Sequence, residues 1–69
     1  MSENRKMTAR DTALEVLRLQ AAGYTTREIA QQLHITQRTV KYHASENYRK
    51  LDARNLVDAV QIAQSLHIL

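Results

Sequence analysis

The sequence predicts an all-α domain built from four helices. The chain contains no proline and a single glycine, Gly23, and good helix formers fill nearly every segment. No strand-like alternation of apolar and polar residues is sustained along it. Its 69 residues leave room for one domain with one core. We expect a flexible lead-in over residues 1–6, which has no apolar residue after Met1, and a single domain over residues 7–69.

The first helix is expected from about Ala9 to Ala22. Thr8, followed three residues later by Asp11, resembles a capping box in which the acid is Asp instead of the usual Glu or Gln. Gly23 is expected to end the helix, where a left-handed backbone is needed. The expected apolar stripe consists of Leu14, Val16, Leu17, Leu19 and Ala21.

The second helix is expected from about Thr26 to Leu33, opened by a capping box of Thr25 and Glu28. Its inward face carries the apolar side chains of this segment. They are Ile29, Ala30 and Leu33. A short break at His34 and Ile35 follows.

The third helix is expected over Gln37–Leu51, with Thr36 as its N-cap. After a short loop over residues 52–54, Asn55 with Asp58 three positions on starts the fourth helix, over about Leu56–Leu66. The inner face of the fourth helix is expected to hold Leu56, Ala59, Val60, Ala63 and Leu66.

The positive charge of the chain is concentrated on the third helix and the residues after it. Residues 36–54 carry five Lys or Arg against two acids, whereas the chain as a whole has a formal net charge of +3. A local basic surface on a small domain indicates a polyanionic partner. Solubility alone is the alternative explanation, and charge by itself does not reject it.

The third helix has two chemically distinct faces. Its inner face repeats at helical spacing and consists of Val40, Ala44, Tyr48 and Leu51. The face that we call the outer face contains neither an acid nor an aliphatic residue. It consists of Arg38, Lys41, Tyr42, Ser45 and Arg49. Arg and Lys suit guanine edges and phosphates, Ser suits either, and an aromatic edge can meet a thymine methyl. The alternative is a solvated face with a stray tyrosine.

A short helix, a break of about three residues and a longer helix form the helix-turn-helix arrangement, whose second helix enters the major groove of DNA. The small Ala30 would let the two helices cross closely, and Ile35 and Val40 would fill the angle between them. His34 occupies a position where many such motifs have glycine, and histidine tolerates a positive φ better than most residues.

The run GYTTREIAQQLHITQRTVKYHASENYRKLDARNLVDAV, residues 23–60, resembles the DNA-binding domain of LuxR/FixJ/GerE-type bacterial transcription regulators. With the segments MTARD and EVLRL upstream, the resemblance extends over about residues 7–69. The residues that match the family pattern in register are Gly23, Glu28, Ile29, Ala30, Leu33, Ile35, Thr39, Val40, Lys41, His43, Lys50 and Leu51.

The resemblance implies a LuxR C-terminal-like domain whose third helix is the recognition helix. The implied base-reading residues are Lys41, Tyr42 and Ser45, with Arg38 beside them. The expected phosphate contacts are Thr25, Thr26, Arg27, Thr39, Arg49 and Lys50. In this family the fourth helix pairs two domains on a near-palindromic site, and the matching outer residues are Val57, Gln61 and Gln64.

The chain departs from the family pattern at a few places. MTARDTALEVLRL has two extra residues near the start of the first helix, so that start is expected to differ. Gln20 stands where leucine is common, and Asp52 and His67 stand where glycine is common. Glu46, close to the groove, would repel phosphate.

Other kinds of site find little support. The chain has no cysteine, so neither a disulfide nor a thiolate metal site is expected. The spacing of His34, His43 and His67 matches no zinc pattern. No catalytic triad, acid pair or phosphate loop is present, and we expect no enzyme activity, cofactor or small-molecule ligand. His43 is expected to pack or to form a hydrogen bond between helices, with direct contact to DNA as the alternative. No membrane span or signal peptide is expected, which favours a bacterial or phage-encoded cytoplasmic protein.

Two functions are therefore expected from the sequence. The first is sequence-specific binding of double-stranded DNA in transcription regulation, as a homodimer through the fourth helix. The alternative is an interaction module that pairs with a full-length regulator of the same type and inhibits it. RNA polymerase is a further possible protein partner.

Overall fold

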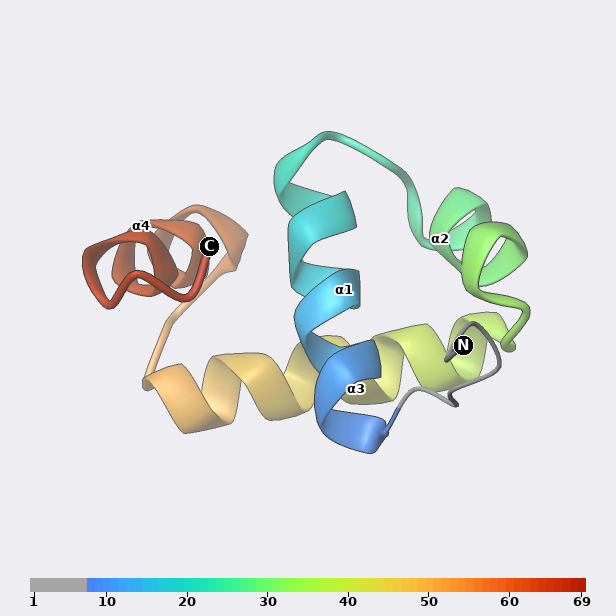
Figure 1. Cartoon of the computed structure of the whole chain (residues 1–69), viewed down its shortest axis with the longest axis horizontal. Helices are drawn as coiled ribbons and strands as arrows, with labels where there is room; N and C mark the ends of the chain where they lie inside the picture. The colour runs from blue at the N-terminus through green and yellow to red at the C-terminus, as the bar shows by residue number, and fades with distance from the viewer. Residues whose placement is uncertain (1–7) are drawn as a thin grey trace, which may run out of the picture.

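The computed structural model describes residues 8–69, which form four helices and contain no strand (Figure 1). Helix α1 spans Ala9–Ala21, α2 spans Thr26–Leu33, α3 spans Gln37–Leu51 and α4 spans Leu56–Ser65. The predicted all-α class is confirmed, and α1 and α4 each end one residue earlier than expected. The expected lead-in over residues 1–6, together with residue 7, lies outside the described residues.

Each helix begins at the capping residue that the sequence predicts. The hydroxyls of Thr8 and Thr25 each accept a backbone N–H at 3.1 Å, from Asp11 and Glu28 respectively. The two carboxylates accept the cap N–H groups in return, which completes both capping boxes. α3 and α4 are capped by the side chains of Thr36 and Asn55.

All four helices end in the same way. The residue after each helix, or after its C-cap, has a positive φ, and the following residue donates its N–H to a carbonyl five residues earlier, at 2.8–3.1 Å. This is the Schellman pattern, which satisfies the last carbonyls of a helix. The four residues are Gly23 (φ 97°), His34 (58°), Asp52 (55°) and His67 (59°). The left-handed backbone expected at Gly23 and His34 is confirmed.

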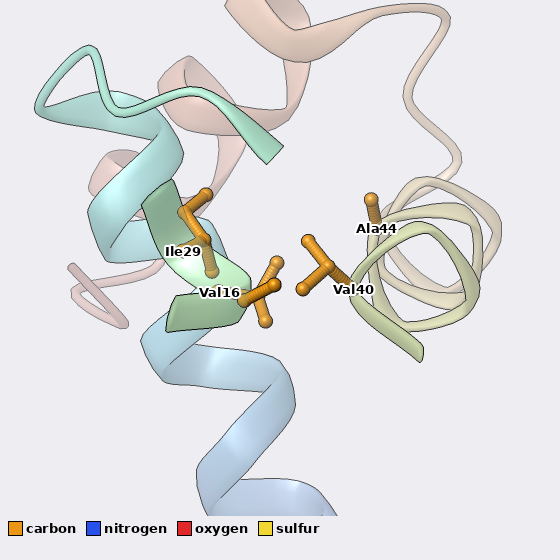
Figure 2. Close-up of a cluster of buried hydrophobic side chains, with 5 residues drawn as sticks. Val16, Ile29, Val40 and Ala44 are labelled. Atoms are coloured by element: carbon orange, nitrogen blue, oxygen red, sulfur yellow. The ribbon is translucent and has the colours of Figure 1, made fainter. Parts of the chain in front are cut away.

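The core consists of two clusters on the two sides of α1. Neighbouring residues on a helix differ by about 100° in direction, so Val16 and Leu17 point into different clusters. The first cluster joins α1, α2 and α3, and in Figure 2 its buried side chains converge. Its buried members are Val16, Ile29, Ala30, Val40 and Ala44. The second joins α1, α3 and α4, and its buried members are Leu17, Ala59 and Ala63.

α3 is the helix on which the others assemble. It contacts α1, α2 and α4, whereas α2 and α4 do not contact each other. In Figure 1, α1 crosses α3 near its middle, with α2 near the first turns of α3 and α4 near its last turns. Three helices therefore cover one side of α3, and its opposite side stays exposed.

Two expected core positions are wrong. Leu66 is exposed, because the positive φ at His67 turns the chain back and Leu69 packs against the second cluster in its place. Ala21 is also exposed, since it lies one turn beyond Leu17, where hollows separate α1 from α4. Leu14 is only half-buried.

Candidate nucleic-acid interface

α2, the break at residues 34–36 and α3 form a helix-turn-helix unit. Ile29 and Ala30 of α2 are buried against Val40 of α3, and Ile35 of the break packs on the same cluster. The small side chain of Ala30 lets the two helices approach closely, as expected. The unit fixes the direction of α3 relative to the rest of the domain.

The outer face of α3 is open to solvent along its whole length. All five of its side chains are exposed, and 61% of the surface of Tyr42 is accessible. Within residues 8–69, Arg38 and Lys41 take part in no ion pair. Their positive charges are therefore available to a partner. The inner face behaves as predicted, with Val40 and Ala44 buried and Tyr48 and Leu51 packed against the second cluster.

Glu46, at the border of the outer face, forms an ion pair with Arg49. The Arg49 guanidinium donates a hydrogen bond of 2.6 Å to the Glu46 carboxylate. This bond and the charge of Arg49 hold the pKa of Glu46 below its ordinary value, and the same contact raises the pKa of Arg49. The negative charge that the sequence places near a phosphate backbone is thus compensated from within the same helix.

The expected phosphate contacts are distributed around α3 and are not gathered in one place. Thr25 and Arg27 are exposed at the start of α2, and Thr26 beside them is half-buried. The half-buried Thr39 shares a hydrogen bond of 2.9 Å between its hydroxyl and that of Thr36, so it also supports the cap of α3. Lys50 is exposed at the other end of α3.

Lys50 also lines a cleft that the sequence reasoning did not foresee. The cleft has a volume of about 130 Å³ and lies between the first turns of α1 and the side of α3. It is lined by Ala9, Arg10, Ala13, Tyr42, His43, Glu46 and Lys50. No sequence signal indicated this site, because it depends on how the first turns of α1 lie against α3.

His43 lies between α1 and the outer face. It is buried to 9% exposure, and its ring meets that of Tyr42 edge-on, with centroids 5.5 Å apart and planes at 67°. The burial agrees with the expected packing role. One turn later, the Asn47 amide donates a hydrogen bond of 2.9 Å to the carbonyl of Ala13, which ties α3 to α1.

The outer side of α4 carries the residues expected at a dimer interface. Val57, Gln61 and Gln64 are all exposed, and Val57 is an apolar side chain with 66% of its surface accessible. Val57 and Gln61 line a hollow of about 230 Å³ between α4 and the end of α1. Gln20 lines the same hollow, and its buried Oε1 has no hydrogen-bond partner within residues 8–69.

Two other kinds of site were searched for in the part of the chain that the structure describes. No group of three His, Asp or Glu side chains there could hold a metal ion. No helix there has the length and apolar character needed to cross a bilayer.

Comparison with known proteins agrees with this architecture. The family model described as "Bacterial regulatory proteins, luxR family" matches residues 5–68. The chain belongs to this family. It is 39% identical over 64 residues to the uncharacterized transcriptional regulatory protein YvfU of Bacillus subtilis, a match that covers 93% of the chain and 31% of YvfU.

Two further relatives are similar over somewhat shorter stretches. The quorum sensing-dependent transcriptional regulator RpaR of Rhodopseudomonas palustris is 47% identical over 55 residues, covering 80% of the chain and 23% of RpaR. The response regulator RamR of Streptomyces coelicolor is 44% identical over 52 residues, covering 75% and 26%. The chain thus spans less than a third of the length of these relatives. No solved structure matches it.

Proposed function

We propose that the chain binds double-stranded DNA sequence-specifically in transcription regulation, with α3 in the major groove. One observation carries the proposal: all five side chains of the acid-free outer face of α3 are exposed, and a helix-turn-helix unit whose inner side is packed presents them. Membership of a family of bacterial regulatory proteins supports it. Such a role places the protein in the bacterial cytoplasm.

The proposed contacts divide into two classes. Base edges would be read by the exposed side chains of Arg38, Lys41, Tyr42 and Ser45. Phosphates would be bound by Thr25, Thr26, Arg27, Thr39, Arg49 and Lys50. The first set lies on one helix face, as base readout requires. The second lies at the start of α2 and along α3, as expected for contacts that position a helix in the groove.

We also propose that two copies bind a near-palindromic site through α4. Val57, which is apolar and exposed, lies at one hollow with Gln20, whose Oε1 has no hydrogen-bond partner within residues 8–69, and both would gain from a partner surface. The same observation favours the second candidate function, in which α4 pairs with α4 of a longer regulator of the family and inhibits DNA binding by that regulator. The relatives are several times longer than this chain and contain a similar segment, so they illustrate the kind of longer regulator that α4 would pair with.

The test is the selection of bound sequences from a random pool of duplexes, followed by measurement of the mass of the complex. The proposal expects an enriched sequence with two related half-sites and two protein chains per duplex. If the protein retained no duplex even at low salt, the DNA-binding proposal would be contradicted and the second function would be favoured. A mixture with a longer luxR-family regulator then tests that function, through loss of that regulator's own DNA binding.

A further inference from the structure

We propose that the cleft between the first turn of α1 and the flank of α3 binds one phosphate of the DNA backbone, held by Arg10 together with Lys50 and His43. The proposal rests on the proposed DNA binding and adds a site to it. Arg10 was not among the residues expected to contact DNA, and it lines the cleft together with His43 and Lys50.

The two cations of the cleft come from different helices. Arg10 lies in the first turn of α1 and Lys50 in the last turn of α3, and both side chains are exposed and line the cleft. Neither forms an ion pair within residues 8–69. The cleft is small, with a volume of about 130 Å³, which suits a compact anion such as one phosphate group.

His43 lies between the two cations and the outer face. Its side chain is nine-tenths buried, forms part of the wall of the cleft and meets the ring of Tyr42 edge-on. The backbone N–H groups of Ala9 and Arg10 have no acceptor within the described residues, and they stand at the positive end of the α1 dipole, which favours an anion.

The position of the cleft indicates a backbone phosphate as the occupant. Tyr42 belongs to the outer face and also lines the cleft, so the cleft opens directly beside the surface proposed to enter the groove. The major groove is about 12 Å wide and is bordered by phosphates, which then lie along the flanks of the inserted helix. Glu46 lines the cleft as well, but Arg49 compensates its charge.

The first experiment compares Arg10→Ala with Arg18→Ala for binding to one duplex over a range of salt concentrations. Arg18→Ala is the control, because it removes the same charge from the same helix. Arg18 does not line the cleft. We expect Arg10→Ala to reduce the slope of log K against log salt by about 0.9, the value for one phosphate contact, whereas Arg18→Ala leaves it unchanged. Circular dichroism checks that both variants fold.

The double variant Arg10→Ala/Lys50→Ala sharpens this test. If both cations are needed to hold one phosphate, Arg10→Ala, Lys50→Ala and the double variant should each lose about one phosphate contact from the slope, and the double variant should not lose two. A loss of two contacts would contradict a shared site. An unchanged slope for Arg10→Ala in a protein that still binds DNA would reject the cleft and leave the proposed function intact, whereas absence of wild-type binding would reject both.

A second measurement separates backbone phosphate from a free anion. The His43 ring signals are followed by NMR while the wild-type protein is titrated with duplex DNA and, separately, with millimolar inorganic phosphate. The proposal expects the signals to shift with the duplex and to change little with inorganic phosphate. Shifts with inorganic phosphate alone would assign the cleft to a free anion and overturn the proposal.

Discussion

Neighbouring side chains on α3 have separate roles, because adjacent residues point in different directions. Lys41 and Tyr42 are exposed on the outer face, whereas His43 and Ala44, which directly follow them, are buried. Substitutions at the exposed positions should therefore change binding without changing the stability of the fold. Substitutions at the buried positions should mainly lower the stability of the fold.

We predict that Lys41→Ala weakens binding to the preferred duplex by about 1–3 kcal/mol, because one base contact is lost. Lys50→Ala should instead weaken binding to all duplexes by a similar factor, because a phosphate contact carries no sequence information. Titration of both variants against the selected duplex and a random duplex distinguishes these outcomes. Wild-type behaviour of both variants would show that α3 is not the recognition helix.

Glu46 offers a test of the ion pair at the border of the outer face. Its pKa is lowered because the carboxylate accepts a hydrogen bond from Arg49. A lowered pKa in the folded state means that the pair is present at neutral pH and is lost as the pH falls through that lowered value.

We therefore predict that the Glu46 carboxyl titrates below the ordinary range of glutamate, as measured by NMR. Arg49→Gln should return its midpoint toward the ordinary value, while the control Arg38→Gln should leave it almost unchanged. A normal midpoint in the wild type would mean that Glu46 is not paired in solution, and that its charge is free to repel phosphate.

At the scale of the elements, the ends of the helices show what the sequence specifies locally. Capping residues and positive-φ positions depend on near neighbours only, so the four N-caps and the turns at Gly23 and His34 could be predicted. Three of the four C-terminal turns place a residue other than glycine in the left-handed region, at a cost of about 1–2 kcal/mol each.

We predict that His34→Gly stabilises the protein by about 0.5–1 kcal/mol, because the relief of backbone strain exceeds the entropy that glycine adds to the unfolded chain. Urea unfolding measures the change. Gly23→Ala provides the reverse control and should lose stability, since its φ of 97° is strained for any residue with a side chain. Equal or lower stability of His34→Gly would show that the imidazole itself stabilises the turn.

Positions that depend on how helices cross were predicted less well. The exchange of Leu66 for Leu69 in the core follows from the path of the chain after α4, which no helical spacing reveals. The bond from Asn47 to Ala13 and the cleft beside Arg10 depend on the crossing of α1 over α3. The outer face could be predicted because all of its members share one helix.

At the scale of the whole molecule, the hydrogen bond from the Asn47 amide to the Ala13 carbonyl connects α3 to α1. The two residues are 34 positions apart in the sequence. We predict that Asn47→Ala lowers the free energy of unfolding by about 1–2 kcal/mol, because a part-buried hydrogen bond is lost and packing is reduced. Urea unfolding again provides the measurement, with the exposed Gln31→Ala as control. A loss no larger than that of the control would show that packing alone holds α1 on α3.

The arrangement of the helices also leaves α4 free for dimer formation. α4 contacts neither α2 nor the outer face of α3, so a second copy could bind α4 while both recognition helices remain free. Two domains related by a two-fold axis would then meet two half-sites. The exposed Val57 is the apolar residue best placed to be buried in that contact.

We predict that Val57→Asp leaves the fold and the affinity for a single half-site unchanged, but removes cooperative binding to a duplex with two half-sites. The substitution places like charges at a symmetric contact, whereas in the monomer residue 57 faces solvent and should alter stability by less than about 0.5 kcal/mol. Sedimentation of the complexes with one-site and two-site duplexes measures stoichiometry and cooperativity together. Retained cooperativity, with two chains still bound, would place the dimer contact on a surface other than this side of α4.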